Sequence, residues 1–292
     1  RDAAGVLEPY LARPGKGVRP ALFFIGCQLE KSSRISSKII RLGLSLELLH
    51  TYLLIHDDIM DRGIERRGGK TLHLLFEAYH RDHRLIGDPV DYGRNMAILF
   101  GDFFASKAEE IWTEAIADWN LNPAVRRQFD RMKHEVYWGQ YLDLAMPTYP
   151  KLPSERLIIQ MMEQKTARYS FFWPLQIGYS IGARNIRQPS WLRDYSFALG
   201  VMYQLVDDLL DGLNVGSSPE KLRQSDIGER KVTLLVRCAY DLASRSDKKA
   251  ILDYYHFKAN DPKTIIQIMT KYDVEKHIRH KVEKYYQASL RA

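Results

Sequence analysis

The sequence predicts an all-α fold that forms a single domain over residues 1–292. Apolar residues recur at three- and four-residue steps along four long stretches, which is the period of an amphipathic helix. Strand-like alternation is scarce, and no linker rich in Pro, Gly or Ser divides the chain. Such stretches include residues 39–61, 95–119, 155–183 and 191–212, which we expect to be helical.

The positions of proline and glycine residues support the assignment of helices. Pro20 opens an apolar run at a position where a first helical turn tolerates proline. Gly212 follows the last long segment, where a helix C-terminus favours glycine. Pro174 lies inside an otherwise helical run, so the sequence predicts a kink there, in a helix that lines a cavity.

One acidic pattern occurs twice, each time at the end of a predicted helix. Its copies are Asp57-Asp58-Ile59-Met60-Asp61 and Asp207-Asp208-Leu209-Leu210-Asp211. The outer aspartates of each copy are four residues apart and share one helix face. Six carboxylates on two facing helices would repel unless a cation lay between them, and oxygen-only ligands suit Mg²⁺. Because Mg²⁺ commonly completes its shell with substrate phosphate, the pattern indicates a phosphorylated substrate.

Basic residues near these motifs favour the same kind of substrate. Arg66 and Arg67 follow the first acidic motif, Lys70 comes just after two glycines, and the basic segment 15–20 lies near the start. A guanidinium group matches phosphate oxygens two at a time. We therefore expect a site for two phosphorylated partners, one held through metal and one directly by Lys and Arg.

Composition argues against several other classes of protein. Lys plus Arg exceed Asp plus Glu by 43 to 36, a net charge of +7, but the basic residues are scattered and we expect no nucleic-acid partner. No run of roughly 18 apolar residues predicts a transmembrane segment. Cys27 and Cys238 lie in apolar surroundings, as reduced thiols of a cytoplasmic protein would. The chain begins with Arg, so we expect that an N-terminal segment is missing from it and leave a targeting signal open.

With these motifs in place, the chain resembles the trans-isoprenyl diphosphate synthases of the polyprenyl synthetase family over nearly its full length. A lone acidic motif would be weak support, whereas the order of the motifs is specific. The further matching motifs are Gly15-Lys16 with Arg19-Pro20, His50, Gly101-Asp102, Gly139-Gln140 with Asp143, Lys165-Thr166-Ala167, Tyr203-Gln204, and Lys231 with Thr233.

The resemblance implies a helical bundle around a deep central cavity, and its members are usually homodimers. It also implies a reaction in which two or three Mg²⁺ ions bridge the aspartate motifs to an allylic diphosphate and draw off pyrophosphate. The double bond of isopentenyl diphosphate then attacks the allylic cation, and loss of a proton gives a product one C5 unit longer. No side-chain nucleophile is required.

The resemblance also assigns roles to individual residues. The metal ligands would be Asp57, Asp58, Asp61, Asp207, Asp208 and Asp211, with Asp58 and Asp208 the least expected to bind directly. The isopentenyl diphosphate pocket would contain Lys16, Arg19, His50 and Arg67. The allylic diphosphate would be held by Arg66, Lys165 and Lys231, beside Thr166 and Gln204. Asp57, Asp61 and Asp207 would act in catalysis together with the three cations of the allylic clamp.

Product length would depend on the residues one turn and more before Asp57. Tyr52, Leu53 and Leu49 would form the floor of the cavity, since each helical turn adds about 5.4 Å of depth. In the family, an aromatic residue at the fifth position before the first aspartate, without one at the fourth, goes with a C20 product. Tyr52 with Leu53 therefore suggests geranylgeranyl diphosphate, with farnesyl diphosphate or a mixture as the alternative.

Two other functions stay open at this stage. A class I terpene cyclase would share the fold, although the all-aspartate form of the second motif and the basic pocket argue against it. A catalytically silent partner subunit of a prenyl synthase is the alternative from a different class. Such subunits usually lose one aspartate motif, whereas this chain keeps both.

Overall fold

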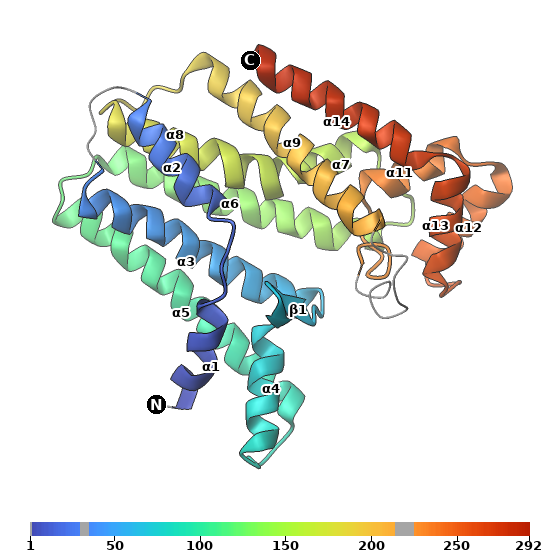
Figure 1. Ribbon diagram of the computed structural model, residues 1–292, viewed down its shortest axis with the longest axis horizontal. Helices are drawn as coiled ribbons and strands as arrows, with labels where there is room; N and C mark the ends of the chain where they lie inside the picture. The colour runs from blue at the N-terminus through green and yellow to red at the C-terminus, as the bar shows by residue number, and fades with distance from the viewer. Residues whose placement is uncertain (1, 30–34, 214–224) are drawn as a thin grey trace. The chain divides into compact units, whose positions relative to one another are not determined.

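The computed structural model describes residues 2–29, 35–213 and 225–292, and this part of the chain is mostly helical (Figure 1). The all-α prediction is confirmed. The chain divides into two compact units, Arg1–Arg126 with Ile181–Ala183 and Arg127–Ser180 with Arg184–Ala292. Whether residues 1–292 act as one domain stays a prediction.

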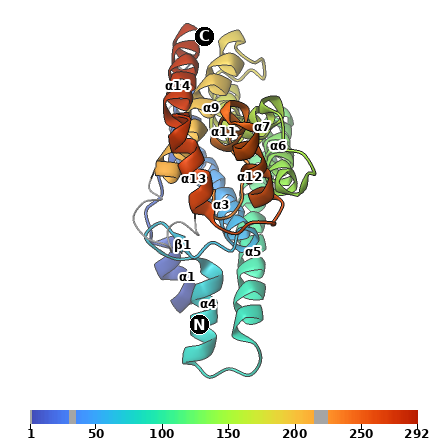
Figure 2. The same ribbon diagram turned by 90° about the vertical axis from the view of Figure 1, so that its right-hand side faces the viewer.

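The first unit contains five helices and a short hairpin among its described residues. They are α1 (Asp2–Leu11), α2 (Val18–Gln28), α3 (Ser37–Met60), β1 (Glu65–Arg66), β2 (Gly69–Lys70), α4 (Leu72–Asp82) and α5 (Pro89–Ala117). Helix α5 packs along both α3 and α4 (Figures 1 and 2). Its start is fixed by Asp88, whose side chain accepts hydrogen bonds from the backbone N–H groups of Val90 and Asp91 at 2.7 and 3.0 Å.

The core of this unit lies beneath the first acidic motif. It is formed by Tyr10, Ile55, Leu72, Phe76, Ala97 and Phe104, which come from α1, α3, α4 and α5. Helices α4 and α5 approach so closely that a Cβ atom on Gly93 would lie 2.3 Å from the carbonyl oxygen of His73. Within this core, α3 packs mainly against α5 and less extensively against α4.

Helix α3 is the one described helix that is long and apolar enough to cross a membrane, judged by length and composition alone. A core helix of a globular protein meets the same criterion. Since α3 packs against α2 and α5, the finding is weak support for a membrane span.

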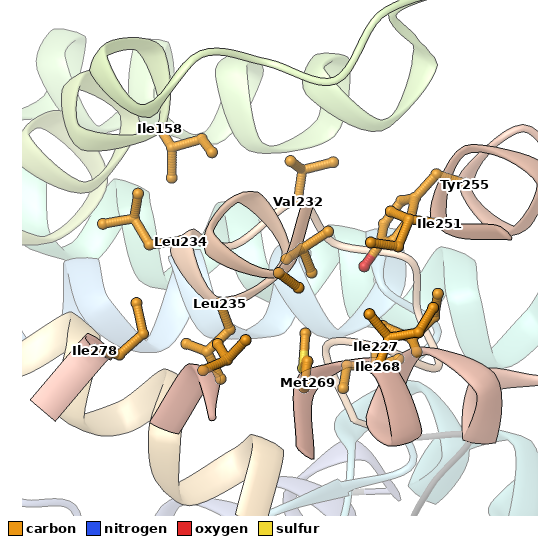
Figure 3. Close-up of a cluster of buried hydrophobic side chains, with 14 of the residues drawn as sticks. Ile158, Ile227, Val232, Leu234, Leu235, Ile251, Tyr255, Ile268, Met269 and Ile278 are labelled. Atoms are coloured by element: carbon orange, nitrogen blue, oxygen red, sulfur yellow. The ribbon is translucent and has the colours of Figure 1, made fainter. Parts of the chain in front are cut away.

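The second unit contains most of α6 and all of the later elements except the end of α8. Its elements are α6 (Pro123–Ala145), η1 (Met146–Thr148), α7 (Glu155–Met162), η2 (Glu163–Phe172), α8 (Trp173–Gly182), α9 (Ser190–Leu213), α11 (Leu234–Leu242), α12 (Arg245–Tyr255), α13 (Pro262–Lys271) and α14 (Val274–Arg291). Helix α14 runs alongside α9. The apolar core shown in Figure 3 joins α7 and α9 to α11–α14.

The predicted helix over 155–183 is continuous, but its middle segment η2 is π-helical. At its end, the backbone N–H of Trp173 donates to the carbonyl of Arg168, five residues earlier. Pro174 follows directly in α8, so its missing N–H falls where the hydrogen-bond register of the helix changes. A change of helical register thus accommodates the proline where the sequence predicted a kink.

Two glycines let neighbouring helices approach the π-helical segment. A Cβ on Gly139 of α6 would lie 2.4 Å from the backbone nitrogen of Lys165. A Cβ on Gly200 of α9 would lie 2.3 Å from the Cα of Ala167. Real Cβ atoms do not come so near to backbone, so only glycine fits at these positions.

We predict that Gly200→Ala lowers the free energy of unfolding by about 1–3 kcal/mol, because overpacking forces backbone shifts. Gly5→Ala is the matched control, since Gly5 lies in α1 with no atom near its Cβ position. This control should be neutral or stabilise by up to about 1 kcal/mol through helix propensity. Urea unfolding followed by circular dichroism measures both; equal midpoints for the two variants would contradict the close packing.

Candidate active site

The first acidic motif lies at the C-terminal end of α3. Asp57 and Asp58 are in its last turn, and Asp61 caps it. The C-terminus of a helix carries partial negative charge, so carboxylates are unfavourable there without a compensating cation. Asp57 and Asp61 are half-buried, whereas Asp58 is only 1% exposed.

Arg66 provides part of that compensation. Its Nε donates to Asp58 Oδ1 at 2.8 Å, and its Nη2 lies 3.6 Å from Asp57 Oδ2. Asp58 Oδ2 is buried and accepts no hydrogen bond among the described residues. Burial raises the pKa of Asp58 to about 6 despite Arg66, and the charges of Asp57 and Asp61 add to the rise. One arginine therefore does not balance this cluster.

The arginine pair is carried by the β1–β2 hairpin. Glu65 pairs with Lys70 and Arg66 with Gly69 in antiparallel register. The two turn residues, Arg67 and Gly68, both have positive φ values, 53° and 72°. This backbone matches the twist of a tight two-residue hairpin. Arg66 therefore lies at the end of β1, and Arg67 lies in the turn that follows it.

Arg13 holds this hairpin to the segment after α1. Its Nη1 donates to the carbonyl oxygens of Arg66 and Lys70, at 3.2 and 2.6 Å. A Cβ on Gly69 would lie 2.6 Å from the guanidinium carbon of Arg13. The sequence did not single out Arg13, because its partners are more than fifty residues away and are backbone atoms.

The predicted isopentenyl diphosphate pocket is partly assembled around His50. Burial lowers the pKa of His50 well below its usual value, and the positive charges of Arg19, Arg67 and Arg66 lower it further. The imidazole is therefore neutral near pH 7 and lies within reach of three guanidinium charges. Lys16, the fourth predicted member, is exposed on the segment before α2.

The predicted floor residues differ in their surroundings. Tyr52 is half-buried against the core of the first unit, and its ring meets the ring of His56 edge-on at 4.6 Å. His56 in turn packs over Gly101, whose Cβ would lie 2.5 Å from the imidazole. Leu49 is buried and Leu53 half-buried. The role of these residues in chain length stays a prediction.

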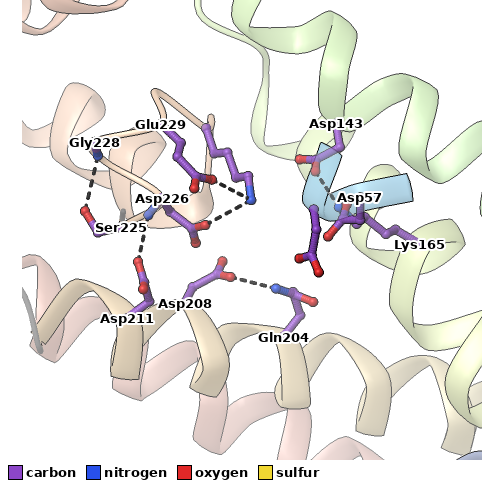
Figure 4. A network of polar contacts seen from close by, with 12 residues as sticks. Asp57, Asp143, Lys165, Gln204, Asp208, Asp211, Ser225, Asp226, Gly228 and Glu229 are labelled. Carbon is purple, nitrogen blue, oxygen red and sulfur yellow. Dashed lines mark hydrogen bonds and ion pairs between the residues drawn. The ribbon is translucent and has the colours of Figure 1, made fainter. Parts of the chain in front are cut away.

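The second acidic motif lies in the last turns of α9 and joins a polar network (Figure 4). Gln204 Nε2 donates to Asp208 Oδ1 at 2.8 Å, as Figure 4 shows. Thr166 Oγ1 donates to Gln204 Oε1 at 2.7 Å. Lys165 Nζ donates to Asp143 Oδ2 at 2.5 Å. The structure thus brings Thr166, Gln204 and Asp208 together, as members of one site would be.

A turn over residues 225–231 faces this motif and supplies further charge. The backbone N–H of Asp226 donates to Asp211 Oδ2 at 2.8 Å. Lys231 Nζ lies 3.0 Å from Glu229 Oε2 and 3.6 Å from Asp226 Oδ1. Two tyrosines of α12 hold the turn in place. The hydroxyl of Tyr254 donates to the carbonyl of Ile227, and the hydroxyl of Tyr255 donates to the carbonyl of Lys231.

Asp226 and Glu229 are residues that sequence reasoning missed. They precede Lys231 in a non-helical segment, so no periodic pattern marks them, and only their nearness to Lys231 could have drawn attention. Burial raises the pKa of Asp226 to about 6, opposed by Lys231 and reinforced by Asp211 and Asp143. Burial also raises the pKa of Asp208 well above its usual value, with Asp226 adding to the rise.

These observations test whether the residues suit a divalent cation. Both Asp58 and Asp208 have a buried Oδ2 without a hydrogen-bond partner in the described chain. No group of three or more His, Cys, Asp or Glu side chains among the described residues converges to form a metal cage. Mg²⁺ is usually bound by one or two carboxylates together with waters and substrate phosphates, so it needs no such cage. The donor set therefore fits Mg²⁺.

The predicted residues fall into both compact units. The first motif lies with Arg66, Arg67, His50 and Arg19 in the first unit, and the second motif lies with Lys165, Thr166, Gln204 and Lys231 in the second. Within each unit, acidic and basic side chains of the predicted site are close to one another.

Several known proteins are similar to this chain in sequence. The sequence profile of the polyprenyl synthetase family matches residues 3–272. A short chain isoprenyl diphosphate synthase of Methanocaldococcus jannaschii is 30% identical over 82% of this chain, which spans 66% of that relative. A geranylgeranyl diphosphate synthase of Sulfolobus acidocaldarius is 29% identical over 94% of this chain and 79% of its own length.

A solved structure is also similar to this chain over nearly its full length. It is geranylgeranyl pyrophosphate synthase from Corynebacterium glutamicum, complexed with isoprenyl diphosphate and magnesium. It is 28% identical, with a TM-score of 0.81, over 99% of this chain and 83% of its own. The family resemblance predicted from the motifs is confirmed, and the chain belongs to the polyprenyl synthetase family of trans-prenyltransferases.

Proposed function

We propose that this protein condenses isopentenyl diphosphate with an allylic diphosphate, releases pyrophosphate, and forms geranylgeranyl diphosphate as its main product. The observation that carries the proposal is that a cation lies beside each acidic helix end. Arg66 is ion-paired with Asp57 and Asp58. Lys231 is ion-paired with Asp226 in the facing turn, and its charge opposes the rise that burial causes in the pKa of Asp211. The proposed assembly is the homodimer expected from the resemblance.

The cations are suited to hold the allylic diphosphate. Arg66, Lys165 and Lys231 are ion-paired with carboxylates and are therefore fixed in place before substrate binds. An incoming diphosphate can exchange with these carboxylates, because phosphate oxygens match guanidinium and ammonium donors. Once bound, Mg²⁺ would compensate the charge of the departing pyrophosphate.

The acidic residues divide into two groups. Asp57, Asp61, Asp207 and Asp211 are the proposed direct ligands of Mg²⁺. Asp58 and Asp208 are buried, unlike the other four, and each has one oxygen committed to a side-chain donor, Arg66 or Gln204. We assign these two residues to orienting the motif, since hydrogen bonds behind a metal site set its geometry.

The proposed isopentenyl diphosphate pocket combines a neutral donor with permanent cations. His50 is neutral at pH 7, so its imidazole can donate one hydrogen bond without adding charge. Arg19 and Arg67 would supply the charge, and Lys16 would reach in from the exposed segment. Holding both substrates in one orientation is the main catalytic task in a reaction without a protein nucleophile.

Incubation of the protein with radiolabelled isopentenyl diphosphate, each allylic primer in turn and Mg²⁺ tests the function. Reversed-phase chromatography of the dephosphorylated products then gives chain length. We expect a C20 product. A C15 product would replace geranylgeranyl with farnesyl diphosphate, and no product with any primer would favour the silent partner subunit.

We predict that Tyr52→Ala shifts the product distribution to longer chains, because it removes a half-buried aromatic ring one turn before Asp57. Tyr240→Ala is the control, a half-buried tyrosine on α11 in the other unit, and should leave chain length unchanged. The same chromatography measures both. If Tyr52→Ala gave an unchanged distribution, Tyr52 would not form the floor.

We predict that Arg13→Gln lowers kcat/KM for the allylic diphosphate by about tenfold, because losing charged hydrogen bonds frees the hairpin that carries Arg66. Arg62→Gln serves as control, an exposed arginine in the loop that leads to the hairpin. Steady-state assays at saturating isopentenyl diphosphate give the comparison. An equal loss in both variants would point to net charge and not to the anchoring of the hairpin.

We predict that Mg²⁺ stabilises the protein more at pH 7 than at pH 4. Asp58 and Asp226 have raised pKa values of about 6, so the folded state holds protons that the unfolded state releases above about pH 4. Stability in EDTA therefore falls as pH rises through this window, by up to about 3 kcal/mol per group. Mg²⁺ favours the ionised carboxylates and should offset this loss.

Thermal unfolding in EDTA and in Mg²⁺ across pH 4–7.5 checks this expectation. At each pH, the unfolding midpoint in EDTA is subtracted from the midpoint in Mg²⁺. This subtraction cancels the contributions of carboxylates that lie far from the metal. Asp194→Asn, an exposed position, should leave this difference unaltered. A difference that is the same at every pH would show that Mg²⁺ does not act on carboxylates with raised pKa values.

A further inference from the structure

A cavity of about 420 Å³ lies in the second unit, beside the π-helical segment. Its wall is formed by α7, η2 and the start of α9, and the polar side chains that line it are Arg156, Gln160, Glu163, Gln164, Arg168 and Arg193. None of these residues belongs to the site proposed above. We call this cavity the arginine cleft.

The arginine cleft carries an excess of positive charge. Three guanidinium groups line it against one carboxylate, that of Glu163. Arg156 and Arg193 are exposed, and no carboxylate of the described residues lies within ion-pair distance of either. A cleft with unneutralised guanidinium groups attracts anions, because its walls focus the field.

Arg168 is the fixed member of the cleft. Its Nε donates to Glu163 Oε1 at 2.9 Å and its Nη1 to Glu135 Oε1 at 2.6 Å. Glu135 is itself held by Trp173, whose Nε1 donates to Oε2 at 2.5 Å. The described residues place no acceptor on Arg168 Nη2, so this nitrogen is available to a ligand while the rest of the side chain stays oriented.

A second, smaller cavity of about 130 Å³ adjoins the cleft, since Glu163, Arg168 and Arg193 line both. Its remaining wall includes Phe172, Trp173 and Phe197. The two neighbouring cavities are thus lined by guanidinium groups and aromatic rings together, which suits a small molecule that carries both charge and apolar surface.

We propose that the arginine cleft binds a small molecule that carries a phosphate group. Guanidinium forks match phosphate oxygens in pairs, and three of them line a volume in the range of small-molecule pockets. Arg168 and Glu163 belong to η2, the ten-residue segment that also carries Lys165 and Thr166. A ligand in the cleft thus contacts the same segment as the proposed active site. This proposal does not depend on the proposed reaction.

Isothermal titration calorimetry with inorganic phosphate tests the cleft. The titrations use Mg²⁺-free buffer at constant ionic strength, and compare wild type with Arg156→Gln/Arg193→Gln. The control is Arg245→Gln/Arg291→Gln, which removes the same charge from two exposed arginines elsewhere in the unit. Phosphate bound at the proposed active site contributes equally to all three proteins.

We expect the cleft variant to lose one phosphate-binding event or to bind it at least about tenfold more weakly, with the control like wild type. Glu163→Gln should bind phosphate more tightly, because it removes the negative charge of the one carboxylate that lines the cleft; a gain of this kind cannot come from misfolding. Basal prenyl transfer should be retained by Arg156→Gln/Arg193→Gln. Equal phosphate binding in the cleft variant and the control would overturn the proposal.

Discussion

The structure depends on one electrostatic constraint: carboxylates are gathered and partly buried at the C-terminal ends of α3 and α9, where the helix itself disfavours negative charge. Removing carboxylates from water without a partner costs several kcal/mol, so cations must be supplied. In the first unit Arg66 does this from the hairpin that Arg13 anchors. In the second, Lys231 does it from a turn held by Tyr254 and Tyr255. Burial nevertheless keeps the pKa values of Asp58, Asp208 and Asp211 above their usual range, so these cations compensate the carboxylates only in part, and a bound metal would add to that compensation.

The packing of the second unit serves the same constraint. Lys165 and Thr166 lie on a π-helical segment. Helices α6 and α9 pack against this segment through close contacts that only glycine allows. π-Helical turns are costly alone and occur where function requires a side chain to be displaced along a helix. Here the altered register directs Lys165 to Asp143 and Thr166 to Gln204, while Arg168 turns to Glu135.

Much of the site could be predicted because its strongest signals are local. Long apolar periodicity gave the helices, and repeated aspartates at four-residue spacing gave the acidic motifs, since both depend on helix geometry alone. The π-helical register over Glu163–Phe172 could not be predicted, because the apolar pattern does not distinguish it from an α-helix and its close contacts with Gly139 and Gly200 exist only in the folded chain. Arg13 was missed because its partners are backbone oxygens more than fifty residues away. Asp226 was missed because it lies in a non-helical turn, and only the folded chain brings it beside Asp211. The neutral state of His50 also follows from burial, which sequence does not reveal.

The most direct measurement of the central claim is the rate of prenyl chain extension by Asp57→Ala and Asp207→Ala at saturating Mg²⁺, beside wild type. If both acidic helix ends hold the metal, each single variant should lose at least about a hundredfold in kcat, since each loses a charge that stabilises the departing pyrophosphate. Extension at the wild-type rate by either variant, with Mg²⁺ still required, would contradict the account.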